Sequence, residues 1–119
     1  MTIRELQDLL ADFARERDWE QFHTPKNLTM ALAGEVGELM EIFQWLDPEQ
    51  SRAVMRSPEQ AKAVAEELAD VFSYLLRLAD VLEVDLARAL VDKMEVNRRR
   101  FPVEAAREHA RRHRSSSDA

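Results

Sequence analysis

Two pairs of carboxylates stand at helical spacing in the middle of the chain. Glu35 precedes Glu38 by three residues, and Glu67 precedes Asp70 by the same interval. Side chains three or four residues apart share one face of a helix, so each pair places two carboxylates one turn apart. Apolar or aromatic residues continue both faces at the same spacing: Ala31, Ile42 and Trp45 around the first pair, and Ala63, Tyr74 and Leu78 around the second. This setting differs from an ordinary solvated helix face.

Carboxylates gathered in this way need a neutralising partner, because they repel one another and are costly to desolvate. No run of Lys or Arg lies on the same faces. Oxygen-only ligands suit Mg²⁺ or Mn²⁺, so a divalent cation is the natural partner. The two pairs, Glu35 with Glu38 and Glu67 with Asp70, can converge on one metal cluster if their helices face each other. The alternative is that the pairs simply face water, as most such pairs do.

Start and stop signals outline the helices that must position these carboxylates. Thr2 and Glu5 form a capping box, and Thr24-Pro25 and Ser57-Pro58 each combine an N-cap with proline at the first helical position. Asp85 is a further N-cap, and Pro102 stops the helix that follows it. Together with apolar residues at steps of three and four, these signals predict helices over 3–17, 25–46, 48–56, 58–82 and 86–100, with an aromatic loop over 18–24.

The composition favours an all-α fold. Among the 119 residues are 2 glycines, 4 prolines and no cysteine, so no disulfide or zinc–thiolate site can form. We predict a four-helix bundle made of the four longer helices. The helix over 58–82 has apolar residues around much of its circumference, and one short chain offers little to cover it. A homo-oligomer is therefore expected.

The charge is unevenly distributed. The formal net charge of −6 argues against a nucleic-acid polymer as partner, yet residues 93–114 are rich in arginine. We expect residues 1–104 to form the domain and residues 105–119 to be a basic, disordered tail. No apolar run is long enough to cross a bilayer, and the N-terminus lacks a secretory pattern. A cytoplasmic protein without membrane contacts is the expectation.

The ordered set of motifs resembles a known family. Glu35-Val36-Gly37-Glu38 followed by Glu67-Leu68-Ala69-Asp70 resembles the E-x-x-E…E-x-x-D signature of the all-α nucleoside triphosphate pyrophosphohydrolases, the MazG-like superfamily. Further segments are similar to its dCTP pyrophosphatase branch, namely residues 13–23, 25–28, 38–45, 70–75 and 93–102. The resemblance as a whole covers about residues 5–104. Two departures are visible: Phe101 replaces a frequent Tyr, and Arg100 stands where Lys is also common.

The resemblance implies an activity and a set of site residues. It implies an oligomer, often a tetramer built from dimers, that uses Mg²⁺ (with Mn²⁺ as a possible substitute) to release pyrophosphate from a nucleoside triphosphate. Glu35, Glu38, Glu67 and Asp70 would be the metal ligands, and Glu35 or Glu38 would also activate the water. The implied substrate contacts are Trp19, His23 and Trp45 to the base, Asn27 to a base edge or sugar, Tyr74 to the sugar, and Lys93, Asn97 and Arg98 to phosphate.

Three functions are compatible with these features. The favoured one is hydrolysis of dCTP or modified dCTP as housecleaning of the nucleotide pool. The second keeps the reaction and changes the substrate to dUTP or a broader set of triphosphates. The third is a non-catalytic helical scaffold that acts through protein contacts, although a scaffold has no need of four ordered carboxylates.

Overall fold

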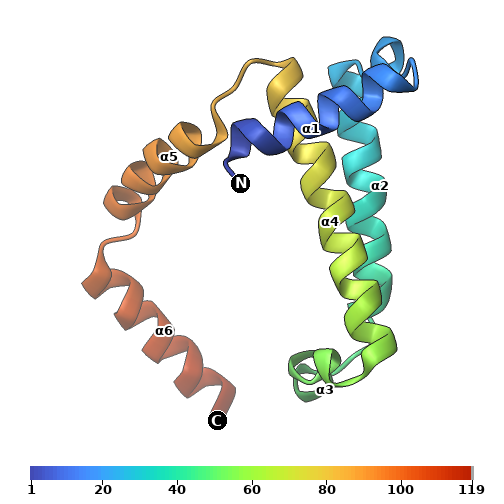
Figure 1. Ribbon diagram of the computed structural model, residues 1–119. Coiled ribbons are helices and arrows are strands. Elements are labelled where there is room, and N and C mark those ends of the chain that lie inside the picture. Colours follow the sequence, from blue (N-terminus) through green and yellow to red (C-terminus); the bar gives the residue numbers. More distant parts are fainter. Residues whose placement is uncertain (119) are drawn as a thin grey trace. The chain divides into compact units, whose positions relative to one another are not determined.

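A computed structural model describes residues 1–118 of the protein, and the side chains of residues 1–114 (Figure 1). Within this described part the secondary structure is entirely helical, as predicted. The chain divides into two compact units, Met1–Val84 and a second that begins at Asp85, and each is described by itself. The elements follow in the order α1 (Ile3–Glu16), η1 (Glu20–Phe22), α2 (Pro25–Phe43), α3 (Pro48–Arg52), η2 (Val54–Arg56), α4 (Pro58–Val81), α5 (Leu86–Arg100) and α6 (Val103–Asp118).

The predicted start signals are confirmed. Thr2 and Glu5 form the capping box of α1, and the side chain of Thr24 accepts from the Asn27 amide at the start of α2. Ser57 caps α4 and Asp85 caps α5 in the same way. Each of these side chains satisfies a backbone donor that the first turn of a helix leaves unpaired. The helix starts are therefore fixed by local chemistry.

The end of α1 sets the position of Trp19. Asp18 adopts the left-handed conformation with φ of 59°, and two bonds close the turn: Trp19 N–H to the Ala14 carbonyl at 2.9 Å and Asp18 N–H to the Arg15 carbonyl at 3.1 Å. This is a Schellman motif, which commonly adds an apolar contact across the turn. Here the contact is edge-to-face, with the Phe13 and Trp19 ring centroids 5.7 Å apart. The turn thus holds Trp19 against α1.

In the first unit α2 and α4 lie side by side and antiparallel, and α1 packs against α4 (Figure 1). The core between them is small. Its most deeply buried large side chains are Leu28 on α2 and Leu76 on α4. Gln7 of α1 is also buried, and its side-chain amide donates to the Leu76 carbonyl at 3.0 Å. This bond satisfies a buried polar group and ties α1 to α4.

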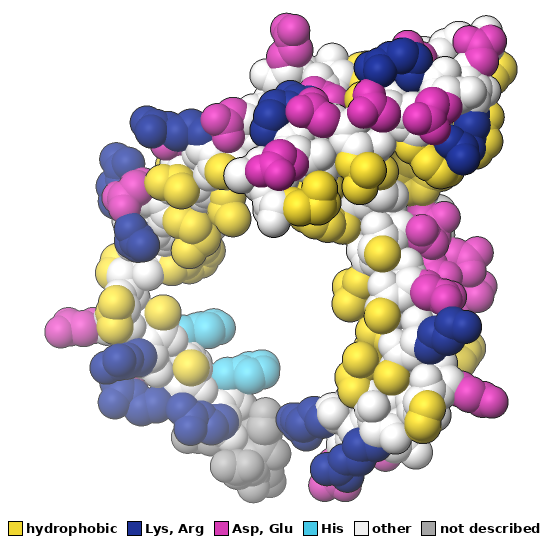
Figure 2. All heavy atoms as spheres, in the orientation of Figure 1, with side chains coloured by type: hydrophobic (Ala, Val, Ile, Leu, Met, Phe, Trp, Pro, Cys, Tyr) yellow, Lys and Arg dark blue, Asp and Glu magenta, His cyan; other side chains and the backbone are white. Residues whose placement is uncertain are grey.

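The apolar stripe predicted on α4 is covered only in part. Val64 is buried, whereas Leu68 and Leu82 are 51% exposed and neighbouring Phe72 is 45% exposed. Figure 2 shows hydrophobic side chains gathered along the antiparallel pair of α2 and α4. A shallow apolar groove lies between α1 and α4, lined by Leu6, Leu9, Leu10, Ala69, Phe72, Ser73 and Leu76. Helices α1 and α2 do not cover every side of α4, so several of its large apolar side chains remain exposed.

The second unit differs from the expectation for the tail. Helix α5 ends at Arg100, close to the predicted stop, but Val103–Asp118 forms helix α6 where disorder was expected from residue 105. Local interactions account for the helix, because Glu108 bonds Arg111 at 3.0 Å and Arg112 at 3.2 Å, one turn away. Ala119 lies outside the described residues. The domain boundary at residue 104 stays a prediction.

The four-helix bundle also stays a prediction. Of its four helices, α1, α2 and α4 lie in the first unit, whereas α5 belongs to the second. Within residues 1–118, no helix is both long and apolar enough to cross a membrane.

Candidate active site

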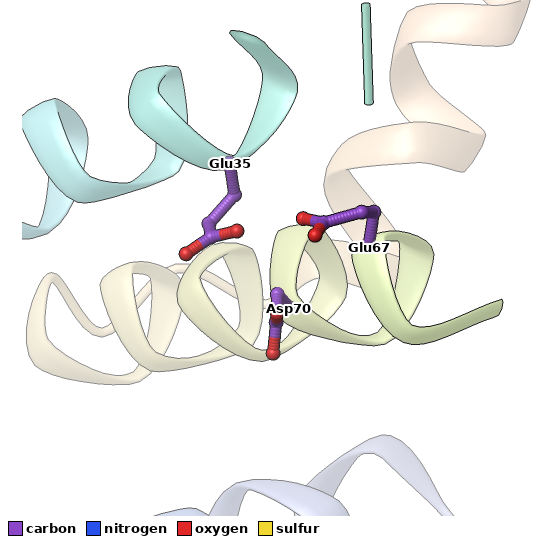
Figure 3. Close-up of side chains that lie close together, drawn as sticks. All are labelled: Glu35, Glu67 and Asp70. Atoms are coloured by element: carbon purple, nitrogen blue, oxygen red, sulfur yellow. The ribbon is translucent and has the colours of Figure 1, made fainter. Parts of the chain in front are cut away.

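The structure brings together three of the four predicted metal ligands. Glu35 from α2 and Glu67 and Asp70 from α4 each contribute a carboxylate oxygen to a group whose atoms lie within 4.8 Å of one another. Figure 3 shows Glu35 and Glu67 reaching toward each other from neighbouring helices, with Asp70 on the next turn of α4. The antiparallel pairing of α2 and α4 therefore produces the convergence that the spacing predicts.

Glu67 has the least favourable surroundings for a charged carboxylate in this acidic cluster. Its Oε2 atom is buried without a hydrogen-bond partner in the described part of the chain. The pKa of its carboxyl is raised, first because burial disfavours the charged form and then because the Glu35 carboxyl lies beside it. The charges of Asp70 and Glu66 add smaller contributions in the same direction. Burial and the neighbouring carboxylates therefore both disfavour the ionised form of Glu67.

No Lys or Arg in the part of the chain with described side chains compensates this charge. Among the residues whose side chains are described, no Lys or Arg forms an ion pair with Glu35, Glu67 or Asp70. A buried carboxylate oxygen without a partner, in a set made only of carboxylates, fits a hard divalent cation. The residues present thus suit Mg²⁺ or Mn²⁺ chemically.

Glu38, the fourth predicted ligand, lies outside this group. It is exposed and follows Glu35 by three residues on α2. Three residues fall short of a full helical turn, so its side chain is rotated about 60° around the helix from that of Glu35. Its role as ligand or base stays a prediction.

A pocket lies on the same unit as the acidic cluster. Its lining combines apolar and aromatic side chains with a few polar ones. The lining residues are Leu10, Phe13, Ala14, Trp19, His23, Ser73, Tyr74 and Arg77. Three of them, Trp19, His23 and Tyr74, are among the predicted substrate contacts. Aromatic walls with a small number of polar groups are typical of sites for small organic ligands.

Helix α4 connects this pocket to the cluster. Asp70 and Tyr74 are one turn apart, about 6 Å along the helix axis, and Arg77 follows on the next turn. Successive turns of one helix thus carry first carboxylates and then pocket residues. A ligand with an aromatic group at one end and anionic groups at the other could contact both.

Arg77 is a pocket residue that the sequence analysis missed. Its Nε donates to Nδ1 of His23 at 3.1 Å, and its Nη1 lies 3.6 Å from Asp80. Burial, followed by the charge of Arg77, lowers the pKa of the His23 imidazole, and Glu20 opposes the shift. The available signal was a single cation inside the apolar run from residue 74 to 79. Such a residue is rarely buried without a partner.

Two predicted base contacts lie elsewhere on the first unit. The side-chain amide of Asn27 donates to the Phe22 carbonyl at 3.0 Å, which holds η1 against the start of α2. Trp45 follows the end of α2 and is 85% exposed. Neither residue lines the pocket, and their contacts with substrate stay predictions.

The three predicted phosphate contacts belong to the second unit. Lys93, Asn97 and Arg98 all lie on α5. Arg98 forms an ion pair with Glu95 of the same helix. Since the two units are described separately, the approach of these residues to the acidic cluster remains a prediction.

Comparison with known proteins places this site in a family context. The model of the MazG-like family matches residues 31–114, which include the acidic cluster and α5. A pyrophosphatase of known structure from Archaeoglobus fulgidus shares the fold, with a TM-score of 0.77 and 43% sequence identity. That similarity covers 83% of this chain and 91% of the archaeal chain.

Curated relatives are similar over most of the chain. Bovine dCTP pyrophosphatase 1 is 50% identical over 106 residues, which are 89% of this chain and 63% of the bovine protein. Human dCTP pyrophosphatase 1 is 48% identical over 112 residues, which are 94% of this chain and 66% of the human protein. The chain thus spans slightly less than two thirds of the length of the curated relatives it matches.

Proposed function

The chain belongs to the MazG-like family, and we propose on that premise that it is a cytoplasmic, Mg²⁺-dependent nucleoside triphosphate pyrophosphohydrolase. Its proposed substrate is a deoxynucleoside triphosphate, dCTP or a modified dCTP, and its products are the monophosphate and pyrophosphate. Identity of about half the residues with two dCTP pyrophosphatases supports this reaction and substrate. The proposed role is housecleaning of the nucleotide pool.

The single observation that carries the proposal is the buried, unpartnered carboxylate oxygen of Glu67 within the acidic cluster. Glu35, Glu67 and Asp70 would hold Mg²⁺, with Glu38 as the fourth ligand, and Mn²⁺ could replace it. When bound, the ion neutralises triphosphate charge and stabilises the leaving pyrophosphate.

The remaining chemistry falls to a carboxylate of α2. Glu35 or Glu38 orients a water molecule in line with the α-phosphorus and accepts its proton. A bond forms between the water oxygen and the α-phosphorus, and the bond from the α-phosphorus to the oxygen that bridges it to the β-phosphorus breaks. The electron pair of the broken bond stays on pyrophosphate.

The pocket supplies recognition. Trp19 provides an aromatic face for the base, His23 a hydrogen bond to base or sugar, and Tyr74 a contact with the sugar one turn from Asp70. Trp45 and Asn27 remain proposed contacts that require movement toward the base. Lys93, Asn97 and Arg98 of α5 are proposed to bind phosphate.

We propose that a homo-oligomer, a tetramer or a dimer, covers the exposed apolar residues of α4. Leu68, Phe72 and Leu82 are each at least 45% exposed, and the apolar groove between α1 and α4 adjoins Phe72. Contiguous apolar surface of this kind usually marks a protein interface. A second copy of the chain offers the same surface in return.

The test is pyrophosphate release by the purified protein with Mg²⁺ across a panel of canonical and modified nucleoside triphosphates. Preference for dCTP or its analogues, with monophosphate and pyrophosphate as products, is the expected result. Preference for dUTP or for many triphosphates would keep the reaction and overturn the substrate. Absence of hydrolysis with both Mg²⁺ and Mn²⁺ would favour the non-catalytic scaffold.

A further inference from the structure

We propose that Arg77 is a positioning residue that fixes His23 as a hydrogen-bond donor inside the pocket. Through Nε2–H, His23 would then recognise an acceptor atom of the bound nucleotide: pyrimidine O2, cytosine N3 or a sugar oxygen. The identity of the ligand rests on the proposed function. The state of the His23 ring does not, because it follows from contacts within the chain.

The direction of the Arg77–His23 hydrogen bond determines the tautomer. Arg77 Nε lies 3.1 Å from His23 Nδ1. A guanidinium has only donors, so Nδ1 must accept and carries no proton. The proton of the neutral ring is therefore on Nε2. A doubly protonated imidazolium could not make this bond, since both its nitrogens are donors.

A chain of ion pairs holds Arg77 in place. The side chain of Arg77 is only 12% exposed, and its Nη1 lies 3.6 Å from Asp80. Asp80 is itself held by Arg4 of α1 at 2.9 Å. The guanidinium is thus held by contacts with both His23 and Asp80. Because the Arg77 guanidinium has low exposure and contacts both His23 and Asp80, one orientation of this group is favoured over others in which it would be hydrated.

The surroundings of His23 keep its ring neutral. Arg77 faces it from α4, Glu20 lies near it on η1, and Tyr74 is the other titratable residue that lines the pocket. Burial and the positive charge of Arg77 act against protonation, and together they outweigh Glu20. The ring therefore stays in the form that accepts from Arg77 at neutral pH.

A fixed tautomer has a consequence for recognition. A free neutral histidine exchanges between two tautomers, so either nitrogen can donate or accept. With Nδ1 occupied, His23 offers the pocket a donor only. Cytosine N3 is an acceptor, whereas uracil and thymine carry a proton at N3 and would face this donor with another donor. Unpaired donors are costly in a buried pocket.

Nitrogen NMR of uniformly labelled, substrate-free protein tests the ring state without any assay of activity. The expected spectrum shows His23 with an unprotonated Nδ1 and a protonated Nε2, and with a titration midpoint below the ordinary histidine value of about 6.5. A protonated Nδ1, or rapid exchange between the two tautomers, would overturn the proposal. This readout stands whether or not the protein hydrolyses a triphosphate.

Variants test the role of Arg77. Arg77→Met removes the donor and the charge but leaves Asp80 paired with Arg4, and Arg77→Lys keeps the charge without the planar donor. Arg77→Met should return His23 to tautomer exchange and raise its titration midpoint, whereas Arg77→Lys keeps both a donor and the charge and should preserve the unprotonated Nδ1. Arg4→Gln is the matched control, because it removes only the outer partner of Asp80 and leaves the Arg77–Asp80 pair and the Arg77–His23 hydrogen bond in place, so the ring should stay in the same tautomer.

Steady-state kinetics test whether the His23 tautomer contributes to binding of the nucleotide. Return to tautomer exchange lowers the share of the donor form by no more than about twofold, so KM for dCTP should rise by at most roughly twofold in Arg77→Met with kcat nearly unchanged. An equal fall in kcat would point instead to a general structural role. Circular dichroism checks the fold of each variant. If neither Arg77 variant folds, the tautomer of the wild-type ring decides the question.

Discussion

The carboxyl groups of Glu35 and Glu67 approach each other from two antiparallel helices, and one oxygen of Glu67 is buried there without a hydrogen-bond partner among the described residues. Such an arrangement opposes folding in the metal-free protein, because like charges repel in a partly desolvated site. A bound cation, as the proposed function requires, would make it favourable. In that proposal the acidic cluster lowers the stability of the metal-free protein in exchange for a metal site.

Replacing Glu67 separates these two effects. Glu67→Gln keeps the shape of the side chain and removes its charge. We expect the thermal midpoint of the metal-free protein to rise by a few degrees, and turnover to fall by roughly 100-fold or more. Differential scanning calorimetry and pyrophosphate release measure the two quantities. Glu66→Gln, the exposed neighbour whose charge makes the smallest contribution to the raised pKa of Glu67, should raise the midpoint less and leave turnover unchanged, and a Glu67→Gln variant that is active or less stable would contradict the assignment.

Glu38 tests whether the metal site extends beyond the three clustered carboxylates. Glu38→Gln should abolish turnover, because the fourth ligand or the general base is lost. The far-ultraviolet circular dichroism spectrum should not change, since Glu38 is exposed. Glu41→Gln, one turn further along α2 and also exposed, is the control and should remain active. Retained activity of Glu38→Gln with Mg²⁺ would confine the site to Glu35, Glu67 and Asp70.

Trp19 tests the pocket. Stacking of a base on an aromatic side chain contributes about 1–3 kcal/mol, so Trp19→Leu should raise KM for the nucleotide by roughly five- to 150-fold. Initial-rate kinetics at saturating Mg²⁺ give this value. Phe22→Leu alters another exposed aromatic of the same loop that does not line the pocket. Similar KM values for these two variants would show that the base binds elsewhere.

The lowered pKa of His23 makes a prediction about acid stability. The unfolded chain takes up a proton near the ordinary histidine pKa of about 6.5, and the native protein does so only at lower pH. The free energy of unfolding therefore falls as the pH drops through this range, and this loss ends below the native pKa. His23→Gln removes the difference, so its stability should decline less than that of the wild type.

Urea unfolding at a series of pH values between about 7.5 and 5 measures this difference. His109→Gln is the control, because it removes an exposed histidine of α6 and leaves His23 in place. The stability of this variant should fall with pH as that of the wild type does. Parallel pH profiles for wild type and His23→Gln would show that the native ring titrates normally.

The helical architecture and much of the site follow from local sequence. The helix caps, such as Thr2 and Ser57, and the E-x-x-E and E-x-x-D spacing are properties of single turns, so they are visible without a structure. Their convergence depends only on α2 and α4 packing as an antiparallel pair. Consecutive long amphipathic helices often pair in this way, and here the connection over residues 44–57, which includes α3 and η2, turns the chain back.

Other features depend on long-range contacts that local patterns do not encode. The role of Arg77 requires His23, 54 residues earlier, to lie beside it. The apolar stripe that includes Leu68 and Leu82 predicts a buried helix face, but the sequence pattern does not say which partner surface would bury it. Helix α6 was missed because its arginines were interpreted as solvated charge, whereas their ion pairs with Glu108 stabilise a helix.

Hydrolysis of dCTP in oxygen-18-labelled water, with and without Mg²⁺, tests the central claim most directly. Mass spectrometry of the products shows which phosphorus the water attacked. The account predicts label in the monophosphate and none in pyrophosphate, with turnover that depends on the metal and is lost in Glu67→Gln. Label in pyrophosphate, or full turnover in excess chelator, would contradict it.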